Sequence, residues 1–75
     1  MRHYITFGQD HYHEVGDKVF DRNCVCLIDT ADHGDRDGRE IAFETFGRKW
    51  SMEYHEKYFD FTSLDRYFKR GIIKL

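Results

Sequence analysis

The feature that most constrains the fold is a turn signal, Gly16-Asp17, with β-forming residues on both sides of it. Glycine at the first central position suits a two-residue type II′ turn, so the pattern predicts a β-hairpin. The turn sets the register of the flanking strands. Continued outward, the expected pairs are Val15 with Lys18, His13 with Phe20, His11 with Arg22, Gln9 with Cys24, Phe7 with Cys26, and Ile5 with Ile28.

Side chains alternate between the two faces of a strand, so this register assigns residues to faces. A bulge at Gly8 or within residues 21–23 would change the pairing. His11 and His13 are expected on the apolar face, near its turn end. The apolar members of that face, which we expect to form a core, are Ile5, Phe7, Phe20, Cys24, Cys26 and Ile28.

An acidic loop over residues 29–37 precedes a predicted helix. Asp37 suits the N-cap of this helix, and Glu40, three residues later, suits a capping box. Ile41, Ala42, Thr45 and Phe46 recur at helical spacing, and Gly47 is a natural residue to follow the last turn.

Three further elements are predicted after this helix. Trp50, Met52 and Tyr54 alternate with polar residues, which is typical of a half-buried strand. Residues 62–70 predict a short helix, and residues 72–75 predict a last strand. The expected fold is therefore a single α+β domain over residues 1–75. It has a small, mainly antiparallel sheet in the order β-β-β-α-β-α-β, with one main helix packed on one face.

Composition limits the classes of partner and the compartment. The chain has 75 residues, a net charge of −2, no basic stripe and no apolar run long enough for a membrane span. No signal-peptide pattern begins the chain, so we expect a cytoplasmic location and no membrane partner. Cys24 and Cys26 share one strand face, where a disulfide between them would be strained, and we expect both to be reduced thiols.

Metal binding is the alternative that the histidines raise. Zinc needs ligands that converge on one point, and the candidates are His11, His13, Cys24 and Cys26. In the expected register His13 lies opposite Phe20, about 13 Å along the strand from Cys24 at about 3.3 Å per residue. A four-ligand site therefore fails. A weaker site that uses His11, His13 and Cys24 stays open.

Two other chemistries fit poorly. A nucleophilic Cys24 beside His11 would need an exposed, electropositive setting, which a core-facing strand position does not provide. The acidic loop matches a calcium loop only in part, because His33 occupies the first position, where aspartate is required. We therefore expect no catalytic residue, no metal and no cofactor.

Aromatic residues crowd the last third of the chain, and two interpretations remain open. Aromatics are over-represented at binding hot spots, which favours a protein interface. Alternatively, Phe61, Leu64 and Phe68 form a second half of the core. Arg66, Lys69 and Arg70 lie among these aromatics, but Asp60 and Asp65 weaken the basic patch, which disfavours nucleic acid as a partner.

The opening segment resembles that of short, uncharacterised bacteriophage and prophage proteins. It runs Tyr4-Ile5-Thr6-Phe7-Gly8-Gln9-Asp10-His11-Tyr12-His13, with the shared pattern Thr-Phe-Gly-Gln-x-His-x-His. The likeness continues in Gly16 to Asp21, in Phe46-Gly47 and in a strand that ends at Tyr54. It implies a small phage-type accessory protein that inhibits or modulates a host protein by stoichiometric binding.

Together these patterns predict a non-enzymatic interaction module. The contact would use a strand edge or the aromatic last third, and self-association through the same surfaces is a second possibility. The alternative is a small metal-binding protein that uses His11, His13 and Cys24. The expected binding residues are Gln9, His11, His13, Tyr54, Tyr58, Phe59 and Tyr67.

Overall fold

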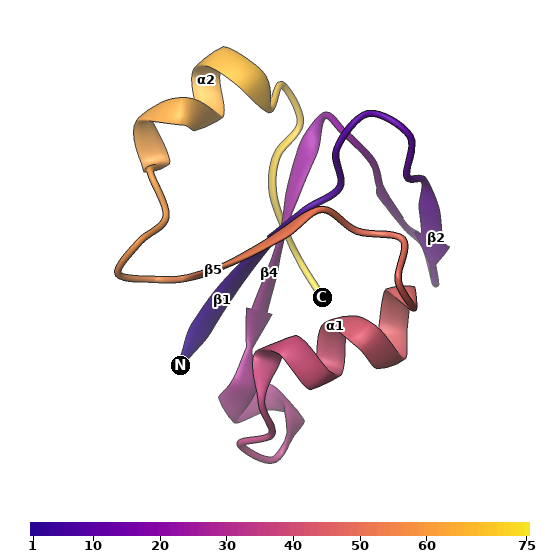
Figure 1. Cartoon of the computed structure of the whole chain (residues 1–75), viewed down its shortest axis with the longest axis vertical. Helices are drawn as coiled ribbons and strands as arrows, with labels where there is room; N and C mark the ends of the chain where they lie inside the picture. The colour runs from indigo at the N-terminus through magenta and orange to yellow at the C-terminus, as the bar shows by residue number, and fades with distance from the viewer.

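The computed structural model describes all 75 residues of the chain. Two sheets are present: four strands in the order β5-β1-β4-β6, and a separate two-stranded hairpin of β2 and β3. Helices α1 and α2 lie on opposite sides of the crossing strands (Figure 1). The elements are β1 (Arg2–Thr6), β2 (His13–Val15), β3 (Lys18–Phe20), β4 (Cys24–Asp29), the 3₁₀ turn η1 (Thr30–His33), α1 (Gly38–Phe46), β5 (Met52–His55), the 3₁₀ turn η2 (Phe61–Ser63), α2 (Leu64–Tyr67) and β6 (Gly71–Lys74).

This arrangement confirms the α+β class with a small, mainly antiparallel sheet. β1 pairs antiparallel with β4 and with β5, whereas β6 returns after α2 and pairs parallel to β4. The turn at residues 21–23 divides the third predicted strand into β3 and β4, so four strands precede α1 instead of three. The chain has two helices: α1 covers one face of the sheet, and the shorter α2 lies on the other side.

The predicted register is right within the hairpin and wrong beyond it. Val15 pairs with Lys18 and His13 with Phe20, but Ile5 pairs with Cys26 instead of Ile28. The reason is that the two connections between the hairpin and the sheet differ in length. Eight positions separate Ile5 from His13, whereas six separate Phe20 from Cys26. The slip is two residues, an even number, so the residues within the strands keep their predicted faces.

The first face, which we define as the face of the sheet that α1 covers, carries the main core. All six of the predicted core residues lie in it. α1 begins at its N-cap Asp37, whose Oδ1 accepts a hydrogen bond from the Arg39 N–H at 2.9 Å. The expected capping box does not form, because the Glu40 carboxylate pairs with Arg36. The main core consists of Ile5, Phe7, Phe20, Cys24, Cys26, Ile28, Ile41, Ala42 and Phe46.

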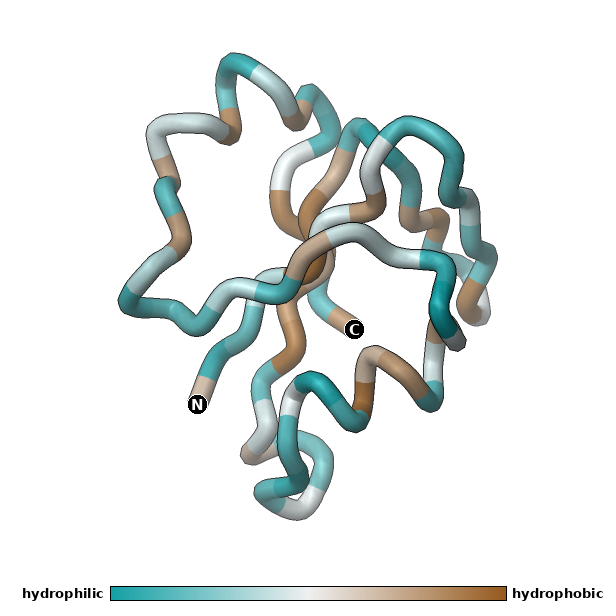
Figure 2. The backbone as a smooth tube through the Cα atoms, in the orientation of Figure 1, coloured by the Kyte–Doolittle hydropathy of each residue, from teal (hydrophilic) through white to brown (hydrophobic).

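The second face, which η2 and α2 cover, carries a smaller core of Tyr4, Val25 and Phe59. Leu64 of α2 and Phe68 are partly buried against it. Hydrophobic residues gather where the strands cross, while much of the connecting chain is hydrophilic (Figure 2). Both faces of the sheet therefore carry a buried core, which has nine residues on the first face and three on the second.

The alternation predicted for residues 50–54 is only partly right. Trp50 precedes β5 and packs against the main core, but Met52 is 49% exposed. Glu53, expected to face solvent, lies opposite Ile5 and therefore on the first face. β5 does not alternate as a half-buried strand would, because Glu53 lies on the face under α1 and Tyr54 packs against the smaller core on the other face. No helix of the chain combines the length and the apolar character that crossing a membrane would require.

Candidate binding groove

A cavity of about 300 Å³ opens on the second face, between β5 and the η2–α2 segment. We call it the aromatic groove. Five of its eight lining residues are hydrophobic, which is typical of a binding cleft. The lining residues are Thr6, Tyr54, Tyr58, Phe59, Asp60, Ser63, Tyr67 and Phe68.

The wall of the aromatic groove is fixed and its rim is open. Phe59 is 8% exposed and stacks on Tyr4, with ring centroids 4.7 Å apart, and the Tyr54 ring meets Phe59 edge-on at 5.8 Å. Tyr58 and Tyr67 are 77% and 62% exposed. The groove therefore combines a packed aromatic wall with two tyrosines that project into solvent.

Local turns hold the rim in place. The Tyr58 N–H donates to the His55 carbonyl at 2.8 Å, which closes the turn after β5. The Asp60 carboxylate accepts hydrogen bonds from the Thr62 N–H at 3.0 Å and from the Thr62 hydroxyl at 2.6 Å. These bonds, and then the charge of Arg66, lower the pKa of Asp60. Asp60 is thus ionised and already engaged within its own turn.

A second cavity of about 500 Å³ adjoins the first and shares Thr6, Tyr54, Tyr67 and Phe68 with it. We call it the arginine groove, because two arginines and no acidic residue line it. The Arg66 guanidinium lies 6.0 Å from the centroid of the Tyr67 ring. The other lining residues of the arginine groove are Gly8, Gln9, Arg22, Asn23, Ser51, Met52 and Arg66.

The chain after α2 brings these two arginines together. The Arg70 N–H donates to the Asn23 carbonyl at 2.8 Å, and the Arg70 guanidinium lies 3.2 Å from the Asp21 carboxylate. These contacts hold the turn at residues 21–23 beside the end of α2. Arg22 therefore reaches the same groove as Arg66, although 44 residues separate them in sequence, from 22 to 66.

Both grooves border an edge of the sheet. β5 is the first strand in the order β5-β1-β4-β6, so β1 is its one strand neighbour. Tyr54 of β5 lines both grooves, and Ser51 and Met52 line the arginine groove at the start of the strand. Exposed edge strands can accept an extended peptide by main-chain hydrogen bonds. The two predicted contact modes, strand edge and aromatic surface, therefore meet at β5.

The structure brings together most of the binding residues predicted from the sequence. Tyr54, Tyr58, Phe59 and Tyr67 line the aromatic groove, with Phe59 buried in its wall. Gln9 lines the adjoining arginine groove.

The two predicted histidines line neither groove. The His13 Nε2 atom lies 2.6 Å from the Lys49 carbonyl oxygen, and its ring packs 4.9 Å from Phe46. His11 is half-buried in the connection before β2. His13 thus has a structural role at the margin of the main core.

The thiols and histidines do not form a metal site, since no group of three or more His, Cys, Asp or Glu side chains is arranged to hold an ion. Cys24 and Cys26 are both fully buried. Burial raises the pKa of the Cys24 thiol and raises that of Cys26 to about 12. Both thiols are therefore protonated at neutral pH, which leaves them poor ligands and poor nucleophiles.

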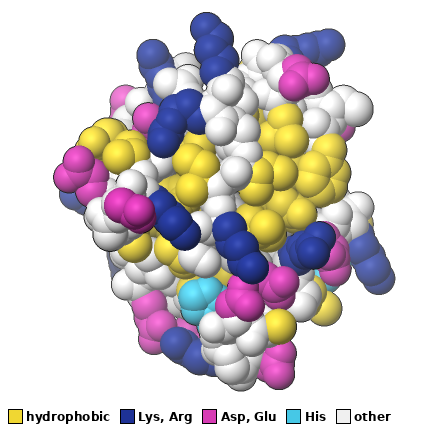
Figure 3. All heavy atoms as spheres, turned by 180° about the vertical axis from the view of Figure 1, so that it is seen from behind, with side chains coloured by type: hydrophobic (Ala, Val, Ile, Leu, Met, Phe, Trp, Pro, Cys, Tyr) yellow, Lys and Arg dark blue, Asp and Glu magenta, His cyan; other side chains and the backbone are white.

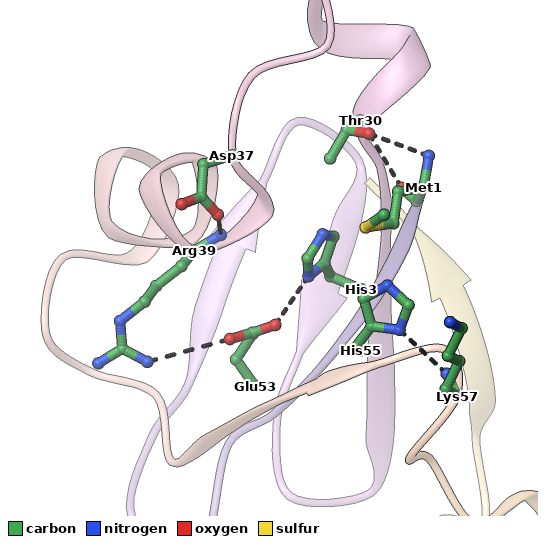
Figure 4. A network of polar contacts seen from close by, with 8 residues as sticks. All are labelled: Met1, His3, Thr30, Asp37, Arg39, Glu53, His55 and Lys57. Carbon is green, nitrogen blue, oxygen red and sulfur yellow. Dashed lines mark hydrogen bonds and ion pairs between the residues drawn. The ribbon is translucent and has the colours of Figure 1, made fainter.

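A polar network under α1 was not predicted from the sequence (Figure 4). The His3 Nδ1 atom lies 2.7 Å from a carboxylate oxygen of Glu53, and the Arg39 guanidinium approaches the other oxygen at 4.0 Å. The His3 ring lies so close beneath Gly38 that a β-carbon at this glycine would overlap it. The network joins β1, β5 and α1, and it lines neither groove.

Hydrophobic side chains also reach the surface on the back of the molecule, among Lys and Arg side chains (Figure 3). Phe61 and Ile72 are the exposed large hydrophobic residues of the second face outside the grooves, at 48% and 38%. Neither lines a cavity.

Sequence reasoning missed Arg22, Asn23, Ser51 and Met52 as groove residues. No local pattern could have found Arg22, because its position depends on the parallel pairing of β4 with β6 and on the Arg70 contacts. A comparison of the chain with protein-family models, curated proteins and solved structures found no match.

Proposed function

We propose that this chain is a non-enzymatic interaction module that binds a partner protein stoichiometrically through the aromatic groove. The observation that carries the proposal is the pair Tyr58 and Tyr67, which stand 77% and 62% exposed on the rim of one cavity. Exposed aromatic surface of this kind is a frequent mark of a binding site. Tyrosine supplies a large contact area and a hydroxyl at low entropic cost, which suits a hot spot.

The arrangement of the groove supports binding over catalysis. Its wall is aromatic, its one carboxylate is engaged by Thr62, and neither cysteine lines it. The adjacent β5 edge adds main-chain donors and acceptors for an extended segment. A partner side chain would enter between Tyr58 and Tyr67, while its backbone lies near β5.

The resemblance of the opening segment to short phage proteins suggests the context. We propose a cytoplasmic host protein as the partner, which the chain inhibits or modulates on binding. Self-association through the same groove is the competing possibility. It makes a distinct prediction, namely that the molecular mass in solution rises with protein concentration.

The test is capture of a partner from a bacterial lysate by three immobilised proteins: wild type, Tyr58→Ala/Tyr67→Ala and Tyr12→Ala. Tyr12 is a matched control because it is 59% exposed and lines neither groove. We expect a stoichiometric partner on wild type and on Tyr12→Ala, with at least about a tenfold loss on the double variant.

Equal capture by all three proteins would contradict the groove as the contact. Absence of any stoichiometric partner, together with a concentration-dependent mass of the purified chain, would favour self-association instead.

A further inference from the structure

Three arginines of the chain have no carboxylate within 4 Å of the guanidinium. Of the seven arginines, Arg2, Arg36, Arg39 and Arg70 lie within 4 Å of a carboxylate. The others are Arg22, Arg48 and Arg66, although the chain holds 14 acidic residues. An unpaired guanidinium presents five donors in a planar fork that fits a carboxylate in a bidentate manner.

Two of these three arginines meet in the arginine groove from segments distant in sequence. Arg22 comes from the turn before β4, and Arg66 comes from α2. The 11 residues that line this groove include no Asp or Glu, in a protein whose net charge is negative. The amides of Gln9 and Asn23 add uncharged donors. The groove is thus a local site for negative charge.

We propose that the arginine groove binds the carboxylates of an acidic, extended segment of the partner protein, whose apolar side chain enters the aromatic groove. This inference rests on the proposed function and names the chemistry of the partner. The two grooves share four lining residues, so one short segment can occupy both. The extended form follows from β5, whose free edge borders both grooves.

The charges favour a protein partner over nucleic acid. Binding along a nucleic-acid backbone uses many cations, whereas two unpaired arginines match a few carboxylates.

The acidic loop over residues 29–37 of a second copy is a poor source of the acidic segment. Most of the chain's own acidic loop is engaged: Asp29 pairs with Arg2, Asp32 pairs with Lys74, and Asp37 caps α1.

The probe for the test is a capped octapeptide in which glutamate alternates with leucine, with a glutamine–leucine octapeptide as its neutral match. We expect saturable binding of the acidic peptide to the wild type at concentrations up to about 1 mM, weakened by added salt. Arg22→Gln/Arg66→Gln should weaken it about tenfold, because two charge-assisted contacts are lost. Lys49→Ala is the control, since Lys49 is exposed, has no acidic partner and lines neither groove.

Three results would overturn the inference: no binding of the acidic peptide at about 1 mM, equal binding of the neutral peptide, or tighter binding of an eight-nucleotide single-stranded DNA. The same arginine variant in the lysate capture separates the two proposals. If the tyrosine double variant loses the partner but the arginine double variant still captures it, the inference is wrong and the proposed function stands. If the tyrosine double variant captures the partner as well as the wild type does, the proposed function itself is wrong.

Discussion

The two faces of the central sheet are covered in different ways. On the first face, nine buried residues form the main core, three of them from the nine-residue helix α1 itself, and Ile5, Phe7, Phe20, Cys24, Cys26 and Ile28 are fully enclosed. On the second face, three buried residues lie under η2 and the four-residue helix α2. The short cover leaves an aromatic groove open beside β5.

Under the proposed function, the first face of this small domain supplies most of its stability and the second face supplies its binding surface. A 75-residue chain has little apolar area to spare, so one face must supply most of the stability. The second face can then keep exposed tyrosines that a fully packed core would have buried. Substitutions on the two faces should therefore have different consequences.

The largest expected effect is in the main core. Phe20 is fully buried and its ring lies 5.3 Å from that of Phe46, so Phe20→Ala should cost about 3–5 kcal/mol of unfolding free energy. Phe61→Ala, on the second face, should cost only about 1 kcal/mol because Phe61 is 48% exposed. Urea unfolding followed by circular dichroism measures both. Equal losses of unfolding free energy in the two variants would contradict the difference between the two faces.

The contact between α1 and the first face predicts a large effect from a small change. Gly38→Ala places a β-carbon against the His3 ring, and Glu53 restrains that ring. We expect a loss of about 1–3 kcal/mol from overpacking, measured by urea unfolding.

A double-mutant cycle with His3→Ala tests the cause of that loss. If Gly38→Ala costs as much in the His3→Ala background as in wild type, steric overlap with His3 is not its origin.

Burial on the first face also predicts a pH effect. The pKa of Cys26 rises from its ordinary value near 9 to about 12, because burial disfavours the thiolate. The folded state therefore keeps a proton that the unfolded state releases. The contribution of this thiol to stability is complete below about pH 9 and falls by about 1.4 kcal/mol per pH unit between about pH 9 and pH 12.

Urea unfolding at about pH 8 to pH 10 measures this slope, with Cys26→Ala as the reference for all other titrating groups. The variant should be less stable at neutral pH but should lose stability less steeply as the pH rises. Parallel curves for the two proteins would show that Cys26 is not shielded as its burial implies.

The parts of the fold that depend on local signals were predictable from the sequence. Gly16-Asp17 set the hairpin correctly, and Asp37 marked the start of α1. The pairing of Ile5 was wrong by two residues, because the lengths of the connections outside the ladder cannot be read from alternation. The strand residues kept their predicted faces because the slip was even. Gln9 and Arg22, which lie in turns, line the arginine groove instead.

The candidate site was predictable only in its aromatic half. Crowded tyrosines in the last third indicated an exposed surface, and three of the four predicted tyrosine and phenylalanine positions remain at least partly exposed, with Phe59 buried. Arg22 and the bond from Arg70 to Asn23 depend on long-range packing of β6 against β4, for which the sequence carries no local signal. His13 was misleading for a similar reason, because its partner is the backbone of Lys49, 36 residues away.

The most direct test of the division between the faces measures stability and binding in one protein, Tyr58→Ala/Tyr67→Ala. Both side chains are exposed, so the unfolding free energy should stay within about 1 kcal/mol of the wild-type value while partner capture is lost. A variant that loses more than about 2 kcal/mol, yet still captures the partner while folded, would contradict the division. That result would place the two tyrosines in the core of the domain and the binding surface elsewhere.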